Sequence, residues 1–228
     1  MISALVSMAI CLQADAAPPL PTEIRLTKGW TCTAKLVRDF SGEDDLSLVQ
    51  TDRVITEFLG SDSEGRLDFR HSVTLEKEVL DGANRPLPAE NFATIFDEKR
   101  TKYGAQFRYT TAVDDADSLM LLSRFITSPI SVNPVKVGET WQFSDRRFMP
   151  YSYSARYLRY ENGIHVIRVY FESLEDPNWS AIGEASVQQN GMPRKVTLTA
   201  KKVLIPGSEV GRVNLKLSYS VTKVTESR

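Results

Sequence analysis

Apolar and polar residues alternate along most of this chain, a pattern typical of strands with one buried and one solvated face. In residues 30–37, for example, Trp30, Cys32, Ala34 and Leu36 share one face, and polar residues occupy most of the other. The pattern predicts strands at 24–38 (a pair broken at Gly29), 49–59, 66–79, 103–113, 152–160, 164–172, 179–188, 193–204 and 210–224. Residues 90–101 fit a short helix or an edge strand equally well.

The connections between these segments favour hairpins. Asn162-Gly163 and Asn190-Gly191 each separate two alternating runs, and Asn-Gly is the strongest short signal for a tight β-turn. The last five strands therefore form an antiparallel meander. The predicted fold class is mainly β, a strongly curved, half-barrel-like antiparallel sheet with one or two short helices.

The best helix candidate is Ser118–Ile126, which follows Asp114, Asp115 and Asp117. Acidic residues stabilise the N-terminal end of a helix, which accounts for the three aspartates. Calcium binding is the alternative, but the segment lacks the glycine and the bidentate glutamate of an EF-hand loop.

Residues 17–228 are expected to form one β-rich domain, with 22–127 and 128–228 as candidate pseudo-repeated halves. Leu26-Thr-Lys-Gly-Trp-Thr and Val135-Lys-Val-Gly-Glu-Thr-Trp each open a strand-rich half. The match is short, so coincidence is the alternative, because glycine followed by an aromatic residue and threonine is common in β proteins.

Residues 1–16 predict a secretory signal peptide, because an apolar run precedes Ala14-x-Ala16. The run lacks a preceding Lys or Arg, so a start further upstream is the alternative. The expected location is exported, either periplasmic or extracellular. No later stretch has the roughly 18 apolar residues of a membrane helix.

Charge and cysteine content narrow the range of partners. The chain has 28 basic and 29 acidic residues, and losing Asp15 with the signal leaves 28 of each. This balance argues against nucleic acid as a partner. Cys32 would then be the only cysteine, which excludes an intramolecular disulfide and favours a buried thiol.

No catalytic or metal-binding motif is recognisable, and no cofactor is expected. The two histidines have ordinary interpretations: His71 lies in an apolar row and is expected to be a hydrogen-bonded core residue, and His165 follows a tight turn and is expected at the surface. We expect no enzyme, with a hydrolase that uses two carboxylates as a minor alternative.

The most suggestive binding feature is the aromatic run that starts at Phe148. Amphipathic rings at the mouth of a groove suit a glycan or a lipid. The alternative is that tyrosine packs a half-buried sheet. The candidate ligand-binding residues are Met149, Tyr151, Tyr153 and Tyr157.

The segment Pro134-Val-Lys-Val-Gly-Glu-Thr-Trp141 resembles a sequence motif found in exported bacterial proteins of unknown function. Gly183–Pro193 looks like the end of the same kind of domain. Such proteins are similar in outline to the lipoprotein-carrier superfamily of the bacterial envelope. The resemblance implies a curved antiparallel sheet around short helices, with a concave side that receives acyl chains. It carries over no functional residue.

Two functions remain open. The first is non-enzymatic binding or carriage of an apolar or amphipathic ligand, such as a lipid, acyl chain or glycan, in an apolar cavity on the concave side of the sheet. The second is a structural or adhesion module that pairs with an envelope protein through an exposed strand edge, such as Val210–Val224.

Overall fold

In the part of the chain that the structure describes, twelve antiparallel strands form one sheet. The computed structural model describes residues 17–42, 47–87, 89–91, 93–101, 104–109, 131, 133–144, 151–173, 179–203 and 213–226. The strands are β1 (Thr31–Ser41), β2 (Ser47–Ser61), β3 (Leu67–Leu80), β4 (Ala83–Arg85), β5 (Thr94–Thr101), β6 (Gly104–Tyr109), β7 (Thr140–Ser144), β8 (Tyr151–Glu161), β9 (Ile164–Ser173), β10 (Ser180–Val187), β11 (Pro193–Val203) and β12 (Val213–Thr225).

The strands follow one another around the sheet in chain order, and the first then meets the last. The order is β6-β5-β3-β2-β1-β12-β11-β10-β9-β8-β7, and β4 pairs with β3 outside it. β1 and β12 pair from Thr31 opposite Thr225 to Ser41 opposite Asn214. This arrangement confirms the predicted meander, and it places β6 and β7 at the two ends of the described sheet.

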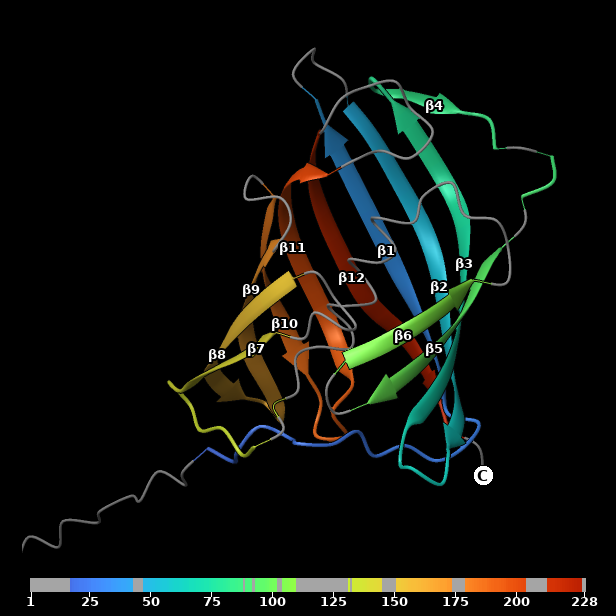
Figure 1. Cartoon of the computed structure of the whole chain (residues 1–228). Coiled ribbons are helices and arrows are strands. Elements are labelled where there is room, and N and C mark those ends of the chain that lie inside the picture. The colour runs from blue at the N-terminus through green and yellow to red at the C-terminus, as the bar shows by residue number, and fades with distance from the viewer. Residues whose placement is uncertain are drawn as a thin grey trace, which may run out of the picture.

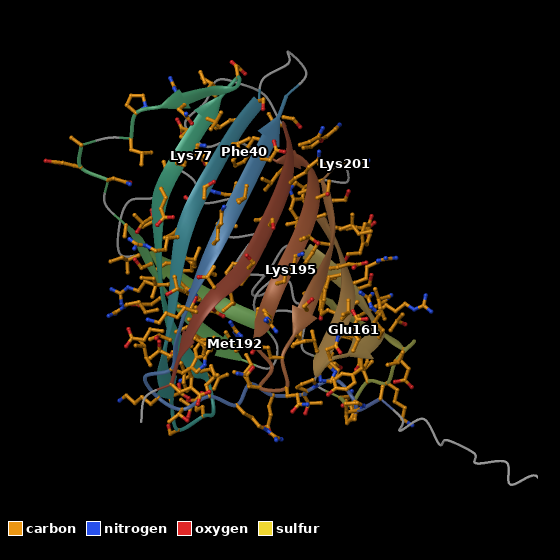
Figure 2. All side chains as sticks on the ribbon, turned by 180° about the vertical axis from the view of Figure 1, so that it is seen from behind. Phe40, Lys77, Glu161, Met192, Lys195 and Lys201 are labelled. Atoms are coloured by element: carbon orange, nitrogen blue, oxygen red, sulfur yellow. The ribbon has the colours of Figure 1, made fainter. Side chains whose placement is uncertain are left out.

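The sheet is strongly curved, as predicted. The long strands β1, β2, β3 and β12 form one wall, β8 to β11 form the other, and β5 and β6 cross in front (Figure 1). Buried and exposed residues alternate along the strands, so one row of side chains points into the concavity. On the convex side of β11, Lys195 and Lys201 are exposed to solvent (Figure 2).

The hydrophobic core lies on the concave side. Its main cluster draws buried side chains from both walls, including Leu36 of β1, Phe96 of β5, Phe171 of β9 and Leu215 of β12. A smaller cluster, which we call the Phe69 cluster, has the buried members Trp30, Cys32, Phe58, Phe69 and Met192. The predicted inward row of Trp30, Cys32, Ala34 and Leu36 is confirmed, since all four are at most 3% exposed.

Residues 17–30, which precede β1 and which we call the leader, lie along one end of the curved sheet (Figure 1). Leu20 is buried, and its amide donates to the carbonyl of Val135 at 2.9 Å. Gly138 has a φ of 90°, and its amide donates to the Tyr157 carbonyl at 2.7 Å, so the turn at this glycine joins the leader to β8. The leader and the turn around Gly138 are therefore part of the folded unit.

One predicted strand needs correction, one undecided segment is resolved, and two predicted segments lie outside the described residues. Residues 24–30 are not a strand; instead the Arg25 amide donates to the carbonyl of Asn190, in the β10–β11 turn, at 2.9 Å. The undecided residues 90–101 contain strand β5. The segments 1–16 and Ser118–Ile126 lie outside the described residues, which contain no helix and hence none able to cross a membrane.

Candidate functional site on the concave face

Three neighbouring strands bring polar side chains together on the concave face. Thr56 of β2 lies opposite His71 of β3, and Phe96 of β5 lies on the other side of His71. Glu98 and Arg100 continue the inward row of β5, because every second residue of a strand shares a face. We call Thr56, His71, Glu98 and Arg100 the polar cluster; all four are buried.

Glu98 is the centre of the polar cluster. Its Oε1 accepts a hydrogen bond from Arg100 Nε at 2.7 Å, and its Oε2 accepts one from Arg100 Nη2 at 3.2 Å. His71 Nε2 lies 2.8 Å from the same Oε2. Burial acts to raise the pKa of Glu98, but the charge of Arg100 and the contact with His71 outweigh it, and the pKa is lowered. Glu98 is therefore a buried carboxylate whose charge Arg100 compensates.

The polar cluster also contains a hydroxyl, an imidazole and a carboxylate in sequence, from Thr56 through His71 to Glu98. Hydrolases use this arrangement to activate a nucleophile. Thr56 Oγ1 lies 3.0 Å from His71 Nδ1. Thr56 is only 1% exposed and His71 2%, so neither is open to a substrate. The arrangement thus favours a structural role of these two residues over hydrolysis. The hydrogen-bonded core position predicted for His71 is confirmed.

Two enclosed hydrogen-bond donors belong to the polar cluster and to the Phe69 cluster. Arg100 Cζ sits 4.5 Å from the ring centroid of Phe69, and Trp30 packs in the Phe69 cluster. Among the described residues, Arg100 Nη1 and Trp30 Nε1 are buried side-chain atoms without a hydrogen-bond partner. Each such donor costs about 1–3 kcal/mol, so both call for a physical explanation.

Cys32 and Tyr219 approach this region from β1 and β12. The Cys32 Sγ and the Tyr219 hydroxyl lie 3.8 Å apart. Burial raises the pKa of the thiol and raises the pKa of Tyr219 well above its ordinary value. Both groups therefore remain protonated at neutral pH, and the predicted buried thiol is confirmed. Within the described ranges, no three His, Cys, Asp or Glu side chains converge as metal ligands.

A second buried ion pair lies further along the concave face. Arg38 of β1 donates from Nε to Asp52 Oδ2 at 2.9 Å and from Nη2 to Oδ1 at 3.0 Å. The side chains are 6% and 1% exposed. Burial raises the pKa of Asp52 even though the charge of Arg38 opposes the shift. Among the described residues, the concave face thus contains two buried arginine–carboxylate pairs within a largely apolar surface.

The predicted ligand residue Tyr153 is buried in the core. Its hydroxyl accepts a 2.7 Å hydrogen bond from Trp141 Nε1, and its ring stacks on Phe171 at 5.5 Å between centroids. Burial raises its pKa. Met149 and the side chain of Tyr151 lie outside the described residues. A role of these residues in ligand binding stays a prediction.

The fourth predicted residue, Tyr157, connects the leader to the core. Its hydroxyl donates to the Pro18 carbonyl at 3.1 Å and lies 2.7 Å from His165 Nδ1. Burial raises the pKa of Tyr157 to about 12. The surface position predicted for His165 is wrong: this residue is 2% exposed, because it points inward beside Tyr157 and Tyr160. Burial lowers the pKa of His165.

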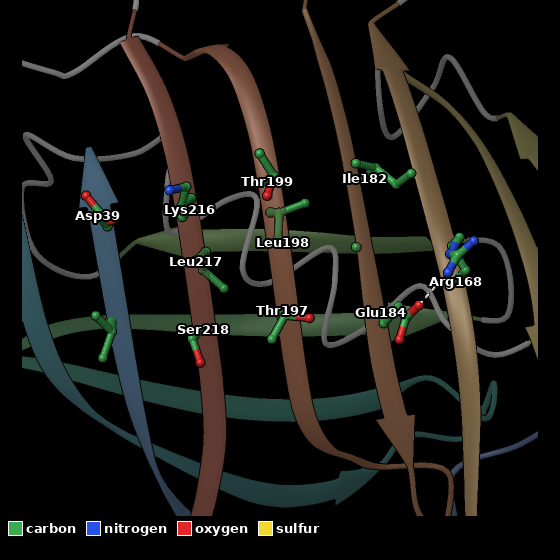
Figure 3. Close-up of a pocket in the computed structure, with 12 residues that line it drawn as sticks. Asp39, Arg168, Ile182, Glu184, Thr197, Leu198, Thr199, Lys216, Leu217 and Ser218 are labelled. Carbon is green, nitrogen blue, oxygen red and sulfur yellow. Dashed lines mark hydrogen bonds and ion pairs between the residues drawn. The ribbon is translucent and has the colours of Figure 1, made fainter. Parts of the chain in front are cut away.

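An open groove of about 560 Å³ crosses the convex face over β1, β12, β11, β10 and β9. Figure 3 views it from outside, with β5 and β6 behind the sheet. Arg168 and Glu184 form a 2.7 Å ion pair at one side, and Ile182 is 51% exposed. Asp39 and Lys216 line the other side. This groove is therefore lined by both basic and acidic side chains, and it lies on the face opposite to the predicted apolar cavity.

Periodicity alone did not reveal the polar cluster, because it leaves residues 90–101 undecided. Once these residues are known to form a strand, Glu98 and Arg100 fall in phase with buried Phe96. The sequence signal that could have revealed such a site is a charged residue within a row of apolar residues on one strand face. Asp52, which lies in phase with buried Val54, carries the same signal.

No family model and no curated protein matches the chain. Among solved structures it is similar to a beta-barrel-like protein of the domain of unknown function DUF1849 from Brucella abortus. That similarity has 9% sequence identity and a TM-score of 0.34, and it covers 90% of this chain and 100% of the other.

Proposed function

We propose that the protein is a non-enzymatic binding protein that holds an apolar or amphipathic ligand against its concave face. The observation that carries this proposal is the pair of enclosed donors, Arg100 Nη1 and Trp30 Nε1, which lack a partner among the described residues. Ligand sites typically combine an apolar lining with a few convergent polar groups. A bound ligand that accepts hydrogen bonds would remove the cost of these two donors.

The same proposal places the protein outside the cytoplasm, in the periplasm or the extracellular medium. The support is the apolar run before Ala14-x-Ala16 and the resemblance of Pro134–Trp141 to exported envelope proteins. N-terminal sequencing of protein recovered from the periplasmic or culture fraction tests this part. A first residue of Ala17 is expected, and recovery of the uncleaved chain from the cytoplasm alone would contradict it.

Binding is tested by native mass spectrometry of the protein purified from its own envelope, followed by organic extraction. We expect a lipid or another amphipathic molecule to co-purify, and saturable binding of the apolar fluorophore N-phenyl-1-naphthylamine by the emptied protein. Ala34→Leu adds bulk on the concave face of β1, where residue 34 is 1% exposed, and should weaken that binding. Thr33→Leu, on the opposite face of the same strand, is the matched control. An empty protein without saturable binding would refute the proposal.

The second candidate function is an assembly module that adds a partner strand. It is favoured by the strand order, which ends at β6 and β7, so each has a single neighbour in the described sheet. The edge predicted at Val210–Val224 is wrong, because β12 lies in mid-sheet between β1 and β11. The test places lysine at every second position of β7, which should block the pairing of a further strand. If this variant no longer captures an envelope partner but still binds the ligand, the result favours this function.

A further inference from the structure

The groove on the convex face is made of two rows of side chains that run across the strands. Each row takes one residue from β10, β11, β12 and β1, and these residues lie opposite one another in the strand register. The rows are Ile182, Thr199, Lys216, Asp39 and Glu184, Thr197, Ser218, Val37. Arg168 of β9 extends the second row, opposite Glu184. Neighbouring strands lie about 4.8 Å apart, so the rows extend over about 19 Å from β9 to β1 and suit an elongated ligand.

Short hydroxyl side chains form the floor of this groove. They are Thr197, Thr199 and Ser218, and the longer side chains of Ile182 and Glu184 stand beside them on β10 (Figure 3). The resulting hollow of about 560 Å³ falls within the range of about 300–1,000 Å³ that is typical of small-molecule sites. Each floor hydroxyl can both donate and accept a hydrogen bond.

The charged side chains of the groove lining balance one another. Arg168 and Glu184 form the 2.7 Å ion pair at the β9 end. Asp39 and Lys216 lie opposite each other at the β1 end, and Figure 3 marks no ion pair between them. Two basic and two acidic groups thus line the groove, and each end has one of each. A charged ligand would meet a like charge at either end, so a neutral ligand fits best.

The polar groups of the groove match the hydroxyl groups of a ligand. The Lys216 ammonium only donates hydrogen bonds and the Asp39 carboxylate only accepts them, whereas a hydroxyl placed between them does both. The backbone groups of β11 and β12 are paired with the neighbouring strands, so a peptide cannot add main-chain hydrogen bonds there. Ile182, which is 51% exposed, adds an apolar surface at the edge of the floor.

From these features we infer that the convex groove binds a neutral oligosaccharide. The sugar hydroxyls exchange hydrogen bonds with Asp39, Lys216 and the hydroxyls of the floor, and the ring carbons pack against Ile182. This site is on the face opposite to the ligand site proposed above, and the inference does not depend on that proposal.

The test is calorimetric titration of three neutral hexasaccharides, cellohexaose, maltohexaose and N-acetylchitohexaose, into the purified protein. At least one should bind saturably, and its affinity should change less than about twofold between about 0.05 M and about 0.5 M NaCl, because salt screens only charged groups. Failure of all three to bind, or a strong dependence on salt, would overturn the inference. Equal or tighter binding of a hexapeptide of alternating serine and glycine would also overturn it and would indicate a peptide ligand.

Filling the floor of the groove should abolish most of this binding. Ser218→Tyr places a ring in the hollow and should lower the affinity at least about tenfold. Ser220→Tyr is the matched control, because Ser220 is a half-buried serine on the same face of β12, two residues beyond the groove lining. Its affinity should equal that of the wild type. A loss in both variants, or in neither, would overturn the location of the site.

Lys216→Ala provides an independent test that does not depend on added bulk. It removes one hydrogen-bond donor at the β1 end and should weaken binding several-fold. Lys195→Ala, at an exposed position of β11 outside the groove lining, should leave the affinity unchanged. Equal effects of the two substitutions would overturn the role of Lys216. Ser218→Tyr should keep the wild-type response to N-phenyl-1-naphthylamine, so failure of the concave site and failure of the groove are measured separately.

Discussion

The buried pair Arg38–Asp52 allows a quantitative test of how charge is accommodated on the concave face. Arg38→Met would leave a carboxylate that is 1% exposed without its counter-charge. Breaking a buried pair in this way costs about 3–5 kcal/mol, a large part of the roughly 5–15 kcal/mol by which domains are stable. The double variant Arg38→Met/Asp52→Leu removes both charges and should recover most of the loss.

The decrease in the free energy of unfolding caused by Arg38→Met should depend on pH. Burial already raises the pKa of Asp52, and removal of Arg38 raises it further. An acid with a raised pKa takes up its proton in the folded state before it does so in the unfolded state, so acidification stabilises the fold through this group. The loss should therefore be smaller at pH 5 than at pH 7.

Urea unfolding followed by tryptophan fluorescence measures these free energies in the wild type, both single variants and the double variant. Arg53→Met is the matched surface control, because Arg53 is 50% exposed and lies 3.5 Å from a half-exposed Glu76. It should change the stability by about 1 kcal/mol or less. If the double variant loses the sum of the two single losses, the two residues are not coupled and the reasoning is refuted.

Other predictions concern the thiol, the buried histidine and the leader. Cys32 should resist alkylation by iodoacetamide in the folded protein and react fully in urea, because burial raises its pKa; fast native alkylation would contradict this. Burial lowers the pKa of His165, so wild-type stability should fall as the pH drops below the ordinary value of 6.5, and His165→Gln should flatten that slope in urea titrations at pH 7 and 5. Leu20→Ala should cost about 2–5 kcal/mol of unfolding free energy, whereas Pro19→Ala, at an exposed site, should cost about 0.5 kcal/mol or less; equal losses would mean that the leader is not anchored through Leu20.

Local patterns were sufficient for most of the long strands and their inward rows. The alternation from Trp30 to Leu36 identified the buried face of β1, and Asn162-Gly163 identified a hairpin whose two turn residues have φ values of 51° and 77°. These features depend on neighbours in the sequence. Periodicity and turn chemistry therefore captured the mainly β, curved antiparallel architecture.

Long-range contacts explain what the sequence did not reveal. Ile24 and Leu26 have strand-like spacing, but the backbone beside them bonds to the Asn190 turn, about 165 residues away in the chain. His165 follows a tight turn, yet its side chain is held inside by Tyr157. Glu98 and Arg100 act together only because β5 pairs with β3, a contact that local composition does not encode.

The pairing of β1 with β12 has a consequence for the order of folding. The two strands join residues 31–41 to residues 214–225, so the centre of the sheet stays open until residues 214–225 have been made. Closing so large a loop is slow, because its entropy is lost before the contacts form. Until then β1 presents an unpaired edge, at which nascent chains can associate. The late pairing of β12 therefore makes β1 the strand that is exposed to association for the longest time during synthesis.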